Sequence, residues 1–176
     1  MTKWVALLRG INVGGRNKLP MAALKDICVA LWPDSAPQTF IASGNMIFDA
    51  DGDATQIATM LGTAISDIHG FDVLVSVTET AAFQKLVKTC PFEGSNGKGI
   101  HGFFCFTPPS PNWEHINKLA VTGEGVEIYH NLVWLHTPQG ISKSKLANGL
   151  TAALGHAPMT ARNLNTLQKL SEMLDG

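Results

Sequence analysis

Leu7 to Lys18 reads LLRGINVGGRNK, so an apolar run gives way at once to glycines, amides and cations. The apolar run itself, Trp4 to Leu8, is typical of a central strand covered by helices. Pro20 marks the start of a helical pattern just beyond the loop. A strand that is followed by a glycine-rich cationic loop presents backbone N–H groups beside positive charge. The segment therefore predicts an anion site.

The rest of the first half extends this strand, loop and helix. Apolar residues recur at helical spacing from Met21 to Leu31. Short apolar runs then flank Ser43-Gly44-Asn45, which is a tight hairpin signal. An amphipathic helix over Ile57–Ile68 and a strand over Val73–Val77 follow. The predicted order is β-α-β-β-α-β.

The second half repeats the order after a bridging helix and a polar connector. Phe103–Phe106 reads as a strand, a hairpin turns about Asn131, and helical spacing covers Leu146–Leu154. A short strand near Met159 and a terminal helix over Leu164–Leu174 complete the set. We therefore predict an α+β protein of two tandem ferredoxin-like (βαββαβ) subdomains with an additional C-terminal helix. The boundaries that we expect are 1–78 for the first subdomain, 79–99 for the bridging helix and connector, and 100–176 for the second subdomain with its helix.

Each predicted subdomain carries one polar cluster at a sheet edge. In the first, the loop after strand one and the hairpin share an edge, which gathers Arg9, Asn12, Gly14, Gly15, Arg16, Lys18, Ser43, Gly44 and Asn45. In the second, the loop after the third strand lies beside the exit of the fourth, which gathers Ser144, Lys145, Thr160, Arg162, Asn163 and Asn165. Docking of the two edges would make one cleft between the subdomains. We expect these residues to bind a small anionic, phosphate-bearing ligand.

The last polar segment allows two interpretations. Thr160 is a candidate N-cap for the terminal helix, with Arg162 and Asn163 in the first turn. A cation there opposes the helix dipole unless an anion or a carboxylate offsets it. The segment is therefore consistent either with a functional Arg162 or with a salt bridge.

Composition limits the classes of function. The chain has 176 residues and a net charge of -1, so no overall field attracts nucleic acid. The three cysteines are widely spaced in apolar settings, which indicates free thiols in a reducing compartment. The N-terminal apolar run is too short for a signal peptide, and no run approaches the ~20 residues that span a bilayer. We expect a cytoplasmic protein without membrane contact, and the sequence gives no indication of its oligomeric state.

Catalytic and metal motifs are not convincing. The loop is close to the P-loop motif, with Gly10 and Gly15 at the required spacing. Arg16 and Asn17, however, occupy the positions where the motif needs Lys and Ser/Thr. Ser142-x-x-Lys145 resembles the nucleophile motif of penicillin-recognising enzymes, yet the companion motifs are missing or reversed. No His or Cys pair has ligand spacing, so we expect neither metal nor cofactor. An enzyme acting on a phosphorylated metabolite through the second cluster stays an alternative.

Nucleic-acid binding is the other alternative, because ferredoxin-like units often bind RNA through aromatic side chains on the sheet. The candidates are Phe103, Phe104, Phe106 and Tyr129. Net charge disfavours this function. The tryptophans fall on apolar faces and are expected in the core: Trp4, Trp32, Trp113 and Trp134.

Five motifs give the chain a family resemblance. They are LLRGINVGGRNKLPM (7–21), ASGNMIF (42–48), CPF (90–92), GISKSKL (140–146) and MTARNLNTLQKL (159–170). With these motifs in this order, the chain resembles the bacterial family catalogued as domain of unknown function 1697. The resemblance implies two ferredoxin-like subdomains and no particular reaction. Ala42 replaces a glutamine and Leu164 a tryptophan that are usual in the family, so the ligand contacts of this member are expected to differ if those side chains touch ligand.

Overall fold

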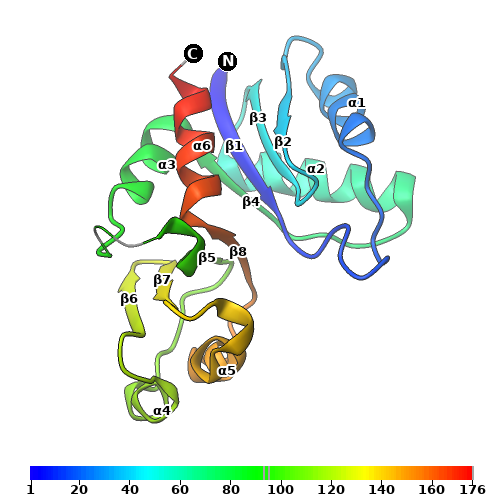
Figure 1. The fold of residues 1–176 in the computed structure, drawn as a ribbon. Coiled ribbons are helices and arrows are strands. Elements are labelled where there is room, and N and C mark those ends of the chain that lie inside the picture. The colour runs from blue at the N-terminus through cyan, green and yellow to red at the C-terminus, as the bar shows by residue number, and fades with distance from the viewer. Residues whose placement is uncertain (93, 95, 176) are drawn as a thin grey trace. The chain divides into compact units, whose positions relative to one another are not determined.

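The computed structural model describes residues 1–92, 94 and 96–175, and these divide into two compact units. Unit 1 comprises Met1–Lys85 together with the chain from Leu170 onward, and unit 2 comprises Leu86–Lys169. Each unit contains one four-stranded antiparallel sheet, and six α-helices lie in the described part of the chain (Figure 1). The fold is therefore of the α+β class.

Unit 1 is built around strand β1 (Thr2–Leu8), which pairs antiparallel with β3 on one side and β4 on the other. The strand order is β2-β3-β1-β4. The other elements of this unit are α1 (Met21–Leu31), β2 (Gln38–Phe40), β3 (Asn45–Ala50), α2 (Ala54–His69), β4 (Val75–Glu79) and the start of α3 (Thr80–Val87).

The continuous apolar pattern of β1 has a structural reason. Trp4, Ala6 and Leu8 alternate onto one face and join the core with residues of α1 and α2. Val5 and Leu7, on the opposite face, are 1% and 2% exposed. Both faces of the central strand are thus buried, as the unbroken apolar run predicts.

Helix α2 has well-defined ends. The Asp53 carboxylate accepts hydrogen bonds from the backbone of Thr55 and Gln56, and the Gln56 side chain accepts one from the Asp53 N–H, which completes a capping box. At the other end Gly70 adopts a left-handed conformation with φ of 75°. These signals lie in the sequence itself, and they fix the length of the helix.

Unit 2 repeats the strand order, with its sheet arranged β6-β7-β5-β8. Its elements are η1 (Gly97–Gly99), β5 (Ile100–Cys105), α4 (Trp113–Leu119), β6 (Gly125–Tyr129), β7 (Leu132–His136), η2 (Ile141–Lys143), α5 (Lys145–Ala153) and β8 (Met159–Asn163). Helix α6 (Leu164–Leu174) begins in unit 2 and continues into unit 1.

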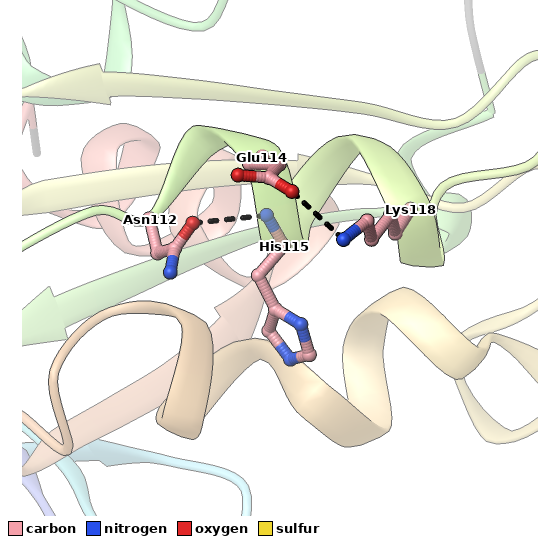
Figure 2. A network of polar contacts seen from close by, with 4 residues as sticks. All are labelled: Asn112, Glu114, His115 and Lys118. Atoms are coloured by element: carbon pink, nitrogen blue, oxygen red, sulfur yellow. Dashed lines mark hydrogen bonds and ion pairs between the residues drawn. The ribbon is translucent and has the colours of Figure 1, made fainter.

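Helix α4 shows how local polar contacts define a short helix in unit 2. Asn112 caps it by accepting a hydrogen bond from the His115 N–H at 3.0 Å (Figure 2). Lys118 pairs with Glu114 one turn away at 2.8 Å. Ile116 is buried among residues of α5 and the sheet, so the opposite face of the helix carries the polar contacts.

Two sequence predictions are wrong. Thr160 does not cap the terminal helix, and Arg162 and Asn163 do not lie in its first turn, because residues 159–163 form strand β8 and pair with β5. The cap is Asn163, whose Oδ1 accepts a hydrogen bond from the Thr166 N–H at 2.9 Å. Trp113 is not in the core: it is 46% exposed at the start of α4.

The free cysteines are Cys28, Cys90 and Cys105. Burial raises the pKa of each thiol.

No helix in the described part of the chain is long and apolar enough to cross a membrane.

His101 in β5 makes the stability of unit 2 depend on pH. Its Nδ1 is buried without a hydrogen-bond partner among the described residues, and burial lowers the pKa below the ordinary value of 6.5. The unfolded chain therefore binds more protons than the folded chain just below pH 6.5. Stability must fall as pH falls through that window.

Replacing His101 by Gln should remove part of this acid sensitivity. Urea unfolding at neutral pH and at mildly acidic pH measures the loss of unfolding free energy for each variant. We expect the loss to be smaller in His101→Gln than in the wild type. His156→Gln, which changes an exposed histidine, should keep the wild-type loss. An equal loss in both variants would contradict this account.

Candidate functional site

The loop that leaves β1, residues 9–20, is anchored to its neighbours at its first residues. The Arg9 N–H donates to the Leu74 carbonyl at 2.9 Å, which ties the loop to the segment leading into β4. The Leu8 N–H donates to the Gly44 carbonyl at 2.8 Å, which ties it to the β2–β3 turn. Residues far apart in sequence thus meet at this end of the first sheet (Figure 1).

Asn12 braces the loop from inside. Its Nδ2 donates to the carbonyls of Leu19 and Ala42 at 2.9 and 2.8 Å, and its Oδ1 accepts from the Leu19 N–H at 2.8 Å. The backbone is left-handed here, with φ of 54°, a conformation that asparagine tolerates better than most residues. The side chain that the sequence analysis assigned to ligand is therefore engaged in holding loop and turn together.

Gly14 and Gly15 form the tip of the loop. Their φ values are 57° and 74°, and the Arg16 N–H donates to the Val13 carbonyl at 3.0 Å across them. This is a two-residue tight turn, in which both central residues need positive φ. Both glycines are exposed, and Asn17 closes the base of the loop by donating to the Gly10 carbonyl at 3.1 Å.

The β2–β3 turn packs directly under this loop. Gly44 has φ of 82°, and a Cβ atom there would lie 2.8 Å from both Leu8 Cβ and Ile11 Cδ1. Asn45 is fully buried and donates to the Phe40 carbonyl at 2.9 Å and to Ser43 Oγ at 3.0 Å. The Ser-Gly-Asn motif is thus built into the contact between turn and loop.

Positive charge is concentrated on this loop. Arg9, Arg16 and Lys18 are exposed, and none of them forms an ion pair or a side-chain hydrogen bond with a described residue. Arg9 lines a hollow of about 420 Å³ together with Gly10 and Asn17 of the loop and Asp72, Val73 and Leu74 of the segment that leads into β4. The Asp72 carboxylate accepts a hydrogen bond from Ser66 Oγ at 3.0 Å. The hollow therefore offers one guanidinium, one carboxamide, one carboxylate and an apolar wall.

In unit 2, Ser144 and Lys145 lie at the start of α5. Ser144 is buried and is the N-cap, with its Oγ accepting from the Ala147 N–H at 3.0 Å. Lys145 is the first helical residue and is exposed. The capping role accounts for the serine in the sequence.

Arg162 and Thr160 lie on one face of β8. Arg162 is 7% exposed, and its Nη1 donates to Thr160 Oγ1 and to the Ala161 carbonyl, both at 2.8 Å. Burial lowers the pKa of Arg162 to about 10. Asn163 is the cap of α6, and Asn165 lies so close to Gly97 that any side chain at that glycine would collide with its Oδ1.

The candidate RNA-binding aromatics differ in burial. Phe104 is 5% exposed, Phe103 and Phe106 are half-buried, and Tyr129 is 45% exposed beside His130. Trp134, in the neighbouring strand, is fully buried and donates to Thr89 Oγ1 at 2.9 Å. Nucleic-acid binding through these side chains stays a prediction.

Asp72 and Leu74 were missed by sequence reasoning. They precede β4, and antiparallel pairing of β4 with β1 brings them to the end of the sheet where β1 stops. The predicted topology already places the start of the fourth strand beside the end of the first. The residues just before that strand are therefore the ones that a sequence analysis could have added to the site.

Fold and site together define a two-unit α+β protein with a braced cationic loop at the end of its first strand. The chain belongs to the DUF1697 family, described as a protein of unknown function, whose model matches residues 1–134. A conserved bacterial protein from Streptococcus pneumoniae, SP0830, has a similar structure, with a TM-score of 0.74 and 24% identity over 98% of each chain. That likeness shows the shared fold. No curated protein matches the chain.

The three side-chain hydrogen bonds of Asn12, here called the brace, make this residue more important for stability than its exposed position suggests. Asn12→Ala loses three hydrogen bonds, whereas Asn17→Ala loses one, and both positions have positive φ. We expect Asn12→Ala to lower the free energy of unfolding by about 2 kcal/mol more than Asn17→Ala. Urea denaturation measures both. Equal losses would show that the brace contributes nothing.

Gly44 should tolerate no side chain. Alanine at position 44 is strained by the left-handed backbone and by close contacts with Leu8 and Ile11. Gly44→Ala should therefore lower the free energy of unfolding by about 3 kcal/mol or more. Gly70→Ala is the matched control, because Gly70 has φ of 75° and open space around it. Its loss should be about 1 kcal/mol. A similar loss in the two variants, measured by thermal or urea unfolding, would refute the packing argument.

Proposed function

We propose that this protein binds a small phosphate-bearing ligand on the loop of residues 9–18 in unit 1. The observation that carries the proposal is the set of three exposed cations on a braced loop: Arg9, Arg16 and Lys18. Because these cations have no carboxylate partner among the described residues, their charge remains available to an anion.

We infer that the ligand lies in the hollow beside Arg9. A guanidinium binds a phosphate group through two parallel N–H donors, which gives orientation as well as charge. The volume of about 420 Å³ exceeds what a phosphate alone needs, so the ligand has an organic part. Asp72, which also lines the hollow, accepts hydrogen bonds and repels a second anion. A phosphate monoester with a hydroxyl group facing Asp72 satisfies these requirements.

The brace supports binding by reducing its entropic cost. Asn12 and Asn17 hold the loop through four side-chain hydrogen bonds in total, so the backbone between them is already ordered. A pre-ordered loop loses less freedom when a ligand arrives. This accounts for two asparagines with left-handed backbones in a segment of six residues.

The strand order of each unit supports an inference about the fold. We infer that each unit is a ferredoxin-like βαββαβ unit, in tandem. The support is the strand order, β2-β3-β1-β4 in unit 1 and β6-β7-β5-β8 in unit 2, with a helix after the first and third strands of each.

Thermal unfolding with added phosphate tests the function. Inorganic phosphate and a sugar phosphate should raise the melting temperature of the wild type, since a ligand that binds only the folded state stabilises it. Arg9→Gln should show a clearly smaller rise than the wild type, because it removes the guanidinium that lines the hollow. Increasing sodium chloride should weaken the effect.

Lys25→Gln is the control for charge alone. Lys25 is an exposed cation on α1, outside the loop, and its removal changes the net charge of the chain by the same amount. We expect it to respond to phosphate like the wild type. If Arg9→Gln and Lys25→Gln respond alike, the phosphate site does not lie at this loop.

A further inference from the structure

A second hollow lies in unit 2, at the end of the sheet where β5 begins and β7 stops. Its volume is about 460 Å³. Its side-chain groups come from Asn96, Lys98 and His136, and the turn after β7 closes it with Gln139 and Gly140. Ile100 pairs with His136, so the ends of the two strands hold the lining together.

The polar groups of this hollow favour an anion. Lys98 is exposed and brings a full positive charge, and none of the described residues that line the hollow is acidic. Asn96 Oδ1 accepts from the Lys98 N–H at 3.0 Å, which leaves the Nδ2 group of Asn96 as a donor. The His136 ring packs against Phe92, with centroids 5.0 Å apart, so one side of the imidazole is fixed by an aromatic neighbour.

Backbone hydrogen bonds connect Gly99 and Gly140, which line the hollow, to Thr137. The Thr137 N–H donates to the Gly99 carbonyl at 2.8 Å, and Thr137 is fully buried. A Cβ atom at Gly99 would lie 3.1 Å from the Thr137 carbonyl oxygen, so only glycine allows this approach without displacing the neighbouring backbone. The Gly140 N–H donates to the Thr137 carbonyl at 2.9 Å and closes the turn. Lys98 and His136 thus stand on either side of a fixed backbone contact.

We propose that this hollow is a second ligand site, which takes a phosphate monoester with a hydroxylated organic part. Lys98 neutralises charge on the phosphate, the His136 imidazole hydrogen-bonds to it, and the carboxamides of Asn96 and Gln139 bind the hydroxyl groups. The site shares no residue with the loop of residues 9–18 and does not depend on ligand binding there.

Residue-resolved NMR of the intact protein tests the site. Glucose 6-phosphate is titrated at constant ionic strength, with glucose as the uncharged control, and amide shifts are followed for residues 98–99 and 136–140, Pro138 excepted. We expect saturable shifts with the phosphate ester and much smaller ones with glucose. Lys98→Gln should weaken the affinity roughly tenfold, because a charge-assisted hydrogen bond is lost. His136→Gln should weaken it as well.

Lys118→Gln is the matched control, since Lys118 is an exposed lysine of the same unit paired with Glu114 on α4. It should bind like the wild type. The absence of saturable shifts at residues 98–99 and 136–140, or equal affinities in Lys98→Gln and Lys118→Gln, would overturn the inference. Shifts confined to Gly10–Lys18 would support the proposed function and overturn this second site, so the two proposals fail separately.

Discussion

The close approach of the β2–β3 turn to the end of β1 is the constraint on which the candidate site depends. Gly44 has no side chain, so Leu8 and Ile11 pack directly against its backbone. That contact brings the Ala42 carbonyl within reach of the Asn12 side chain. The loop between β1 and α1 is then held from below by the turn and from within by its own asparagine. A larger residue at the turn would collide with Leu8 and Ile11 and disturb this contact.

This constraint explains how a nearly neutral chain presents a local positive field. The net charge is -1, yet three cations lie within ten residues of one another on a loop that cannot collapse against the sheet. Charges on a flexible loop would be averaged over many positions. Bracing keeps Arg9 beside the hollow that also contains Asp72 and Leu74. The positive charge of Arg9 and the hollow thus lie together at one end of the first sheet.

Most of the elements of the fold could be predicted from the sequence, because helices and strands carry periodic apolar patterns and clear end signals such as Asp53 and Gly70. The individual roles of polar residues could not. The sequence predicts a ligand contact for Asn12 but not its hydrogen bonds to Leu19 and Ala42, because hydrogen bonds between remote segments leave no periodic trace. Thr160 was assigned to a helix end for lack of apolar alternation in β8. Lys98 was placed in a connector, although strand pairing brings that segment beside His136.

A crystal structure of the protein soaked with tungstate would show whether the loop of residues 9–18 binds an oxyanion. Tungstate is a tetrahedral oxyanion like phosphate, and its anomalous scattering locates it without ambiguity. The account predicts a tungstate ion within hydrogen-bond distance of the Arg9 guanidinium, with the Asn12 brace and the Gly14–Gly15 turn unchanged. Tungstate bound elsewhere on the protein, with none near Arg9, Arg16 or Lys18, would contradict it.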